Sequence, residues 1–199
     1  MKKLLTLTLA FIFLLSAQTF AAENFKVAVG DPEDSEQAVA ARAFKKYVED
    51  ATKGAVKIEL FYGGQLGDES EAFRNVQKGT LPFAVGGIAN LVPFEKRLGI
   101  LNLPYLWDNL DEVVAGTNGK AADLLQSFAL KAGFRILCWT YTDFRFISNS
   151  KHPIKKMSDM KDLKFRVPQS PVLIASYKAF GGSPTPISWA ETFTALQQG

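Results

Sequence analysis

The first half of the chain alternates between short apolar strand patterns and amphipathic helix patterns. Three strands are predicted, at Phe25–Gly30, Val56–Phe61 and Phe83–Val85. Between the first two strands, apolar side chains recur at helical spacing up to Ala51, in a helix that is predicted to begin at about Asp34 as its N-cap, with Gln37 three residues on. A second helix is predicted to begin at Asp68, with Glu71 at the capping-box position. This order of strands and helices is typical of an α/β protein with a parallel sheet.

In such sheets, ligands bind beyond the carboxyl ends of the strands. Three loops follow the predicted strands, Gly30–Ser35, Tyr62–Glu69 and Gly86–Asn90. We therefore place a ligand site at this edge and include Glu69 among its candidate contacts. As a pair, Asp68 and Glu69 are better explained as helix-capping residues than as an acid–base pair for catalysis.

The middle of the chain is apolar and interrupted by prolines. The segment Ile88–Trp107 predicts short helices and turns, and two further helices are predicted at about Leu110–Gly116 and Gly119–Ala132. The run Phe134–Tyr141 predicts a fourth strand, apolar enough to be central in the sheet. Cys138 lies in this run and is expected to be a buried small hydrophobic residue.

The pattern changes after Tyr141. Two alternating strands and a helix are predicted at Asp143–Asn149, Leu163–Val167 and Ser170–Phe180. A turn bracketed by prolines follows, and Ser188 is expected to cap the last helix with Glu191 as its reciprocal partner. We place a domain boundary near residue 143, which gives one lobe of residues 22–142 and a second of residues 143–199. The ligand cleft is expected between them.

Residues 1–21 have the pattern of a secretory signal peptide. Lys2 and Lys3 precede the apolar run Leu4–Leu15, and small residues then offer a cleavage site before Ala22. A membrane anchor is the alternative, but the run is shorter than the ~20 residues that a spanning helix needs. We therefore expect the protein to be secreted through an N-terminal signal peptide.

The charge and the rare residue types narrow the function. The formal net charge is +3, of which Lys2 and Lys3 supply two, and residues 1–21 contain no acid. The mature chain therefore carries a net charge of one, which argues against nucleic acid as a partner. A single cysteine excludes an internal disulfide, and one cysteine with one histidine argues against a zinc site, so no cofactor is expected.

No set of catalytic residues stands out in the sequence. The chain lacks a Gly-x-Ser-x-Gly elbow and a phosphate-binding loop of P-loop spacing. A Ser-His-Asp triad would need His152, which lies in a polar loop with no marked partner serine or acid. We predict that the protein is not an enzyme, with an exported hydrolase that uses His152 as the alternative.

Two arginines and a tryptophan are candidates for binding an organic acid. Arg145 and Arg166 lie in the two alternating strands, and a guanidinium group can meet a carboxylate with two parallel hydrogen bonds. Two ordinary surface arginines would give the same pattern. Trp189 opens the last helix, where its ring could lie against a ligand or belong to the core. Asn149 and Gln169 could add hydrogen bonds to the ligand.

Several motifs along the chain carry a family resemblance. They are QLGD at Gln65–Asp68, VQKGTL at Val76–Leu81, LPYL at Leu103–Leu106, SDMKDLKFRVP at Ser158–Pro168, FGGSPTP at Phe180–Pro186 and ETFTALQQG at Glu191–Gly199. Together they resemble the substrate-binding proteins of tripartite ATP-independent periplasmic (TRAP) transporters, the DctP family. The resemblance extends through nearly all of the mature chain.

The resemblance implies a periplasmic-binding-protein-like α/β fold of two lobes joined by a long hinge helix. Such a protein closes on its ligand and delivers it to a sodium-driven membrane permease. The family's Lys-x-Arg-Val-Pro segment places its main carboxylate clamp at Arg166. The resemblance also implies a second anion contact at Arg145 and a ring contact at Trp189.

Two departures from the family pattern limit what the resemblance implies. Members that bind sialic acid have an acid soon after the third strand, where this chain has Gly86 and Gly87, so sialic acid is not the expected ligand. Family sequences also continue past Gly199 into the rest of both lobes. The chain is therefore expected to be truncated at its C-terminus.

We predict the periplasmic solute-binding subunit of a TRAP transporter that captures a small organic acid. C4-dicarboxylates, 2-oxo acids, hydroxy acids and sugar acids all offer the carboxylate that Arg166 would bind. A binding protein of the same fold that serves a sensor kinase fits the sequence equally well.

Overall fold

The computed structural model describes residues 22–199, and the predicted signal peptide lies outside them. The elements, in chain order, are β1 (Glu23–Val29), α2 (Glu36–Ala51), β2 (Val56–Phe61), α3 (Glu69–Gln77), β3 (Phe83–Val85), α4 (Ile88–Leu91), η1 (Lys96–Asn102), α5 (Leu110–Asn118), α6 (Lys120–Lys131), η2 (Met157–Met160), β4 (Lys164–Val167), α7 (Pro171–Ala179), β5 (Ser183–Pro186) and α8 (Trp189–Gln198). Among residues 22–199, no helix is both long and apolar enough to cross a bilayer.

The first three strands form a parallel sheet, as the alternating pattern predicted, and their order in the sheet is β2-β1-β3. Successive side chains of β1 point to opposite faces of this sheet. Val27 and Val29 pack with Ala41 of α2 on one face, and Ala28 packs with Ala72 of α3 on the other. Both faces of the sheet are therefore covered, as is usual for parallel sheets.

The caps of the first helices follow the sequence with one shift. Ser35, rather than Asp34, is the N-cap of α2, and its hydroxyl accepts a hydrogen bond from the N–H of Ala38 at 3.2 Å. Asp68 caps α3, and Asp68 and Glu71 form the predicted capping box. The cap fixes the first turn of α3, and with it the position of Glu69.

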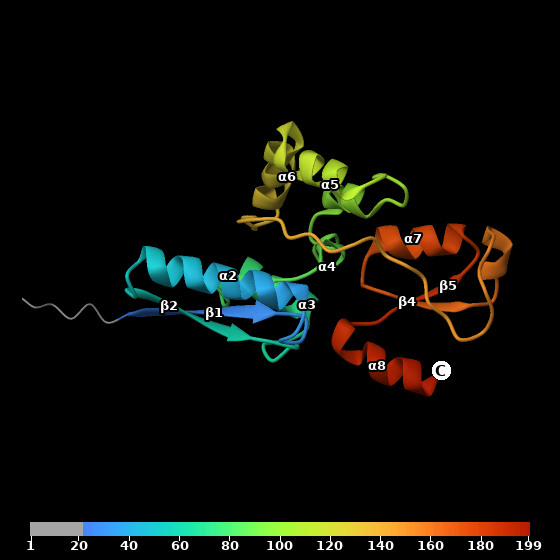
Figure 1. Ribbon diagram of the computed structural model, residues 1–199, viewed down its shortest axis with the longest axis horizontal. Helices are drawn as coiled ribbons and strands as arrows, with labels where there is room; N and C mark the ends of the chain where they lie inside the picture. The colour runs from blue at the N-terminus through green and yellow to red at the C-terminus, as the bar shows by residue number, and fades with distance from the viewer. Residues whose placement is uncertain (1–21) are drawn as a thin grey trace, which may run out of the picture.

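The helices in the middle of the chain surround a separate apolar core. Leu98 of η1 is fully buried there, together with Phe73, Leu91, Leu125, Ala129 and Phe134. In Figure 1, α5 and α6 lie above the β1–β3 sheet, and the segment with α4 connects the sheet to these helices. This core therefore holds α3, α6 and the segment after α6 against one another.

The strands predicted at Phe134–Tyr141 and Asp143–Asn149 are wrong, since residues 134–149 contain neither helix nor strand. A strand needs a neighbour whose backbone groups complement its own. Among residues 22–199, no strand pairs with this segment. Instead, the side-chain amide of Gln126 bonds both the N–H and the carbonyl of Ile136. The apolar pattern reflects packing of this segment on the core around Leu98.

The prediction that Cys138 is buried is also wrong, because its side chain is exposed. A central strand is covered on both faces by other elements. In the segment that contains Cys138, it is Phe134, Ile136 and Trp139 that pack against the core around Leu98, and Cys138 does not.

The last part of the chain forms a second, two-stranded parallel sheet of β4 and β5, connected through α7. The sequence predicted a turn at Ser183–Pro186, where the structure has β5. Pro184 and Pro186 lack the N–H that a central strand would use, but an edge strand tolerates proline. Ser188 precedes α8, and its hydroxyl donates to the Glu191 carboxylate at 2.6 Å without bonding the helix backbone.

Figure 1 shows the two sheets on opposite sides of the molecule, with the carboxyl end of β1 directed towards β4, β5 and α8. The architecture is mixed α/β, with one parallel sheet on each side. The boundary near residue 143 stays a prediction. The arrangement brings the loops after β1 and β3 towards the end of β4.

Candidate ligand-binding cleft

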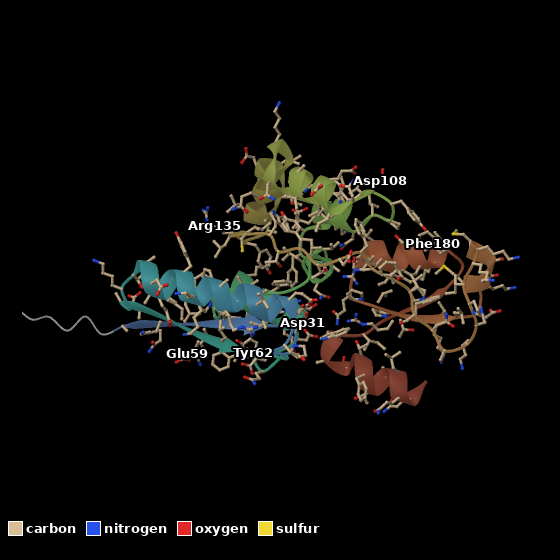
Figure 2. All side chains as sticks on the ribbon, in the orientation of Figure 1. Asp31, Glu59, Tyr62, Asp108, Arg135 and Phe180 are labelled. Carbon is tan, nitrogen blue, oxygen red and sulfur yellow. The ribbon has the colours of Figure 1, made fainter. Side chains whose placement is uncertain are left out.

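A cavity of about 590 Å³ is lined by residues of the region around the β1–β3 sheet and of the region around the β4–β5 sheet. Its walls include Asp31 after β1, Glu69 of α3, Arg145, Arg166 of β4 and Trp189 of α8. Small-molecule sites typically have volumes of roughly 300–1,000 Å³. Figure 2 shows Asp31 at the end of the β1–β3 sheet that faces the second region. The cavity therefore lies at the edge where the parallel sheet predicted a ligand site.

Arg166 is held by its own part of the chain. Its Nε donates to the carbonyl of Ile187 at 2.9 Å, and Ile187 N–H donates to the carbonyl of Val167 at 3.0 Å. Phe165 is buried on the opposite side of β4, so the alternation predicted for this strand is confirmed. Among the described residues, the two terminal nitrogens of Arg166 have no hydrogen-bond partner. They are therefore free to bind a ligand carboxylate.

Three other charged groups near the cavity affect the pKa of Arg166. Burial lowers the pKa of the Arg166 guanidinium, and the positive charge of Arg145 lowers it further. The negative charges of Glu69 and Asp31 act in the opposite direction and raise this pKa. An anionic ligand would offset both the burial of Arg166 and its repulsion from Arg145.

Trp189 lies next to this arginine. The Arg166 Cζ is 5.5 Å from the centroid of the Trp189 ring, a distance suited to a cation–π interaction. The side chain is 51% exposed and lines the cavity. Because of this exposure, Trp189 is not part of a core formed by the described residues. Its ring is therefore available to an organic ligand.

Glu69 is the most deeply placed acid of the cavity wall, at 9% exposure. Its Oε1 accepts hydrogen bonds from Gln37 Nε2 at 2.7 Å and from the N–H of Gly87 at 3.1 Å. Its Oε2 accepts one from Asn90 Nδ2. The carboxylate also lies at the N-terminus of α3, where the helix dipole favours a negative charge. Helix capping therefore accounts for the role of Asp68, but it does not account for the orientation of the Glu69 side chain towards Gln37, Gly87 and Asn90.

Two glycines make room for this buried carboxylate. A Cβ atom at Gly30 would lie 2.2 Å from Cγ of Glu69, and one at Gly86 would lie 3.2 Å from Cδ of Glu69. Only glycine lets the backbone approach this closely. The chain has no acid at Gly86 or Gly87, and the Glu69 carboxylate occupies the space next to these two glycines.

Asp31 and Gln37 are among the polar residues of the cavity that the sequence did not identify as ligand contacts. Asp31 directly follows Gly30 in the first of the three loops expected to face the ligand, so its position was the available signal. Gln37 lies in the first turn of α2, where the sequence predicted a partner of the helix cap and not a residue of the cavity. Only the fold places its side chain on Glu69.

The pKa of Asp31 is raised to about 6, mainly by burial and then by the charges of Glu69 and Glu36, against the charge of Arg166. Charging this carboxyl therefore destabilises the folded state as the pH rises from about 4 to about 6. Replacement of Asp31 by asparagine should raise the free energy of unfolding at pH 7 by roughly 1 kcal/mol, a value discounted for solvent screening.

This gain should shrink as the pH falls through 6 and vanish below about pH 4, where Asp31 is protonated in both states. Urea unfolding at pH 4 and pH 7 measures it. The exposed acid Asp111 provides a control, and Asp111→Asn should show no such pH-dependent gain. Equal stability of wild type and Asp31→Asn at pH 7 would contradict the prediction.

The other predicted site residues lie in different places. Gln169 lines a smaller pocket beside the cavity, shared with Glu69 and Trp189. Asn149 lines neither pocket, and its Oδ1 accepts hydrogen bonds from the N–H groups of Lys151 and His152. His152 is exposed, with Nδ1 3.2 Å from the carbonyl of Pro153. The structure therefore brings together Arg166, Arg145, Trp189, Glu69 and Gln169, without Asn149.

The chain is similar to known proteins over almost all of the described residues. Residues 27–199 match the family described as bacterial extracellular solute-binding protein, family 7 (DctP). A solute-binding protein of Verminephrobacter eiseniae is 40% identical over 187 residues, which cover 92% of this chain and 55% of that protein. The chain thus spans little more than half the length of this relative.

Solved structures show the same relationship. A TRAP periplasmic solute-binding protein from Polaromonas sp. JS666, bound to D-erythronate, has a TM-score of 0.86 and 33% identity, over 89% of this chain and 58% of that chain. Another from Sulfurospirillum deleyianum, with bound succinate, has a TM-score of 0.83 and 27% identity, over 90% of this chain and 58% of that chain.

Proposed function

The chain belongs to the bacterial extracellular solute-binding proteins of family 7, and on that premise we propose that it is the periplasmic solute-binding subunit of a TRAP-type transporter. It captures a small organic acid in the cavity between its two regions and delivers it to a membrane permease. The family consists of substrate-binding proteins of transporters rather than enzymes, and we propose the same for this chain. His152, which a hydrolase would need, is exposed and does not line the cavity.

The observation that supports this proposal best is that Arg166 is partly buried and has two terminal nitrogens without a hydrogen-bond partner among the described residues. A buried cation costs free energy unless an anion and hydrogen bonds compensate it. A carboxylate supplies both, through two parallel hydrogen bonds. Arg145 lines the same cavity and adds a second positive charge.

The position of the cavity supports capture by closure. Asp31 and Glu69 reach it from the β1–β3 region, whereas Arg166 and Trp189 reach it from the β4–β5 region. A ligand that contacts both regions binds the closed arrangement more tightly than the open one, and so selects it. Closure would cover the exposed face of Trp189.

The experiment that tests this function is a thermal-shift screen of organic acids and uncharged sugars, with the protein in the full length that its gene encodes. A ligand at 100 times its Kd should stabilise the protein by about 2.7 kcal/mol, which raises Tm by several degrees. We expect a shift with at least one class of acid and none with the sugars. Shifts with sugars alone, or with no compound, would contradict the proposed function.

A further inference from the structure

The backbone fixes Asp31 beside the cavity. The N–H of Gly30 donates to the carbonyl of Val85 at 3.2 Å, and the carbonyl of Asp31 accepts a hydrogen bond from the N–H of Gly63 at 2.8 Å. These bonds tie the loop after β1 to the end of β3 and to the loop after β2. The side chain of Asp31 therefore stays at the edge of the sheet that faces the region around the β4–β5 sheet, where it lines the cavity (Figure 2).

The carboxyl group of Asp31 lies among charges but receives no hydrogen bond from the described residues. Partial burial disfavours its ionised form, and the negative charges of Glu69 and Glu36 disfavour it further. The positive charge of Arg166 opposes these effects without cancelling them, so the pKa of Asp31 is raised to about 6. Since an ordinary aspartate titrates near pH 4, Asp31 gains and loses its proton much closer to neutral pH.

Other titratable or charged side chains line the cavity from each neighbouring element. They are Glu36 of α2, Glu69 of α3, Arg166 of β4, and Arg135, Cys138 and Arg145 of the segment after α6. The Glu69 carboxylate already accepts three hydrogen bonds, and Glu36 is exposed to solvent. Arginine keeps its charge throughout the neutral range. Among these groups, Asp31 is thus the carboxyl group that has neither hydrogen-bond donors nor full contact with solvent.

An anionic ligand adds one more negative charge to this cavity. A negative unit charge about 10 Å away, at an effective dielectric constant of about 20, raises the pKa of a carboxyl group by about 1. Closure of the two regions around the ligand would also remove water from Asp31, which acts in the same direction. A bound acid therefore raises the pKa of Asp31 above its value in the ligand-free protein.

We propose that the protein takes up a proton at Asp31 when it binds its acid, so that the cavity captures an anion and a proton together. This inference rests on the proposed function. The proton comes from the solvent and converts the Asp31 carboxylate into a neutral carboxyl group. The ligand carboxylate then lies on Arg166 and Arg145 without a charged Asp31 on the facing wall. Binding should therefore weaken as the pH rises through the range in which ligand-free Asp31 loses its proton.

A ligand that used Asp31 in its ionised form would behave differently. An ammonium group, or hydroxyl groups that donate to this carboxylate, would favour its charge and lower its pKa. Such a ligand would take up no proton, and it would bind more tightly as the pH rises. The direction of the proton exchange therefore distinguishes the two modes of binding.

The test is calorimetric titration of the full-length protein at pH 7 in two buffers with different enthalpies of ionisation, PIPES and imidazole. The probe is the tightest binder among fumarate, pyruvate, lactate and gluconate, one acid from each class that the sequence leaves open. We expect uptake of about 0.4 proton per bound acid. A rise of about 1 in a pKa near 6 takes the protonated fraction at pH 7 from about 10% to about 50%. This measurement uses the wild-type protein and does not depend on a variant that folds.

The affinity should depend on pH for the same reason. Between pH 5.5 and pH 7.5, the Kd of the probe should rise about sixfold. Carboxylic acids of these four kinds are ionised almost completely over this range, and thiols are ordinarily neutral there. Neither the ligand nor a thiol would therefore supply the change.

Asp31→Asn assigns the proton to one residue, because asparagine has nearly the same size and does not titrate. This variant should take up less than about 0.1 proton, and its Kd should change by less than about twofold between the same two pH values. His152→Gln is the matched control, since histidine is the residue type that ordinarily titrates in this range. His152 is the one histidine of the sequence, is exposed and does not line the cavity. Its replacement should leave the proton uptake of the wild type unchanged.

The outcomes separate this inference from the proposed function. Binding of the probe with proton release, or with no proton exchange, would overturn the inference and leave the proposed function intact. Uptake that persists in Asp31→Asn, or that disappears in His152→Gln, would overturn the assignment to Asp31. Failure of all four acids to bind would overturn the proposed function together with the inference.

Discussion

Replacing Arg166 by alanine is expected to raise the Kd for the bound acid at least about 30-fold, which corresponds to about 2 kcal/mol. The substitution removes the cation that faces the cavity and leaves the ligand carboxylate without its bidentate partner. Arg145 alone would remain, and its more exposed side chain is better screened by solvent. Calorimetric titration of wild type and Arg166→Ala with the acid found in the thermal-shift screen measures this loss.

Lys164 provides the matched control for this experiment. It is a cation of the same strand, β4, but it is exposed and its Nζ donates to the carbonyl of Gly199 rather than lining the cavity. Lys164→Ala should change the affinity by less than about twofold, as is usual for an exposed charge. An affinity of Arg166→Ala close to that of wild type would show that the acid binds elsewhere.

Replacing Leu98 by alanine should lower the free energy of unfolding by about 3 kcal/mol. Leu98 is at 0% exposure and packs in the core with Phe73, Leu125 and Phe134. The shorter side chain loses its apolar contacts and leaves a cavity that close-packed neighbours fill only in part. Urea unfolding followed by circular dichroism measures the change.

The control for the core variant is Leu124→Ala. Leu124 lies on α6 near the same core, but its side chain is 54% exposed. The same substitution there should cost less than about 0.5 kcal/mol, because little buried surface is lost. If both variants were destabilised equally, the burial of Leu98 would not be the cause.

Arg166 and Trp189 illustrate which residues of the cavity could be predicted. Arg166 and Trp189 were identifiable because a strand end and a helix start are local features of the sequence. The structure places both on one cavity, 5.5 Å apart from Cζ to ring centroid. Gln37 could not be identified in this way, because its role depends on Glu69, which lies 32 residues further along the chain.

Asn149 shows the opposite case, a predicted contact that the structure does not place on the cavity. As a polar residue near Arg145 it was a reasonable ligand contact, but its side chain instead accepts hydrogen bonds from two backbone N–H groups of the following turn. Asparagine commonly bonds nearby backbone in this way. Its chemistry suits either role, so the residue type alone could not distinguish them.

By itself, the sequence determined the α/β class, the order β1-α2-β2-α3-β3 and the capping box at Asp68, all of which depend on periodicity and contacts within a few residues. Tertiary structure decided whether an apolar segment became a strand. Phe134–Tyr141 has the composition of a strand but no partner among the described residues, whereas Ser183–Pro186 has two prolines and pairs with β4. Strand pairing joins backbone groups that are distant in sequence, and a local pattern does not record which partners are present.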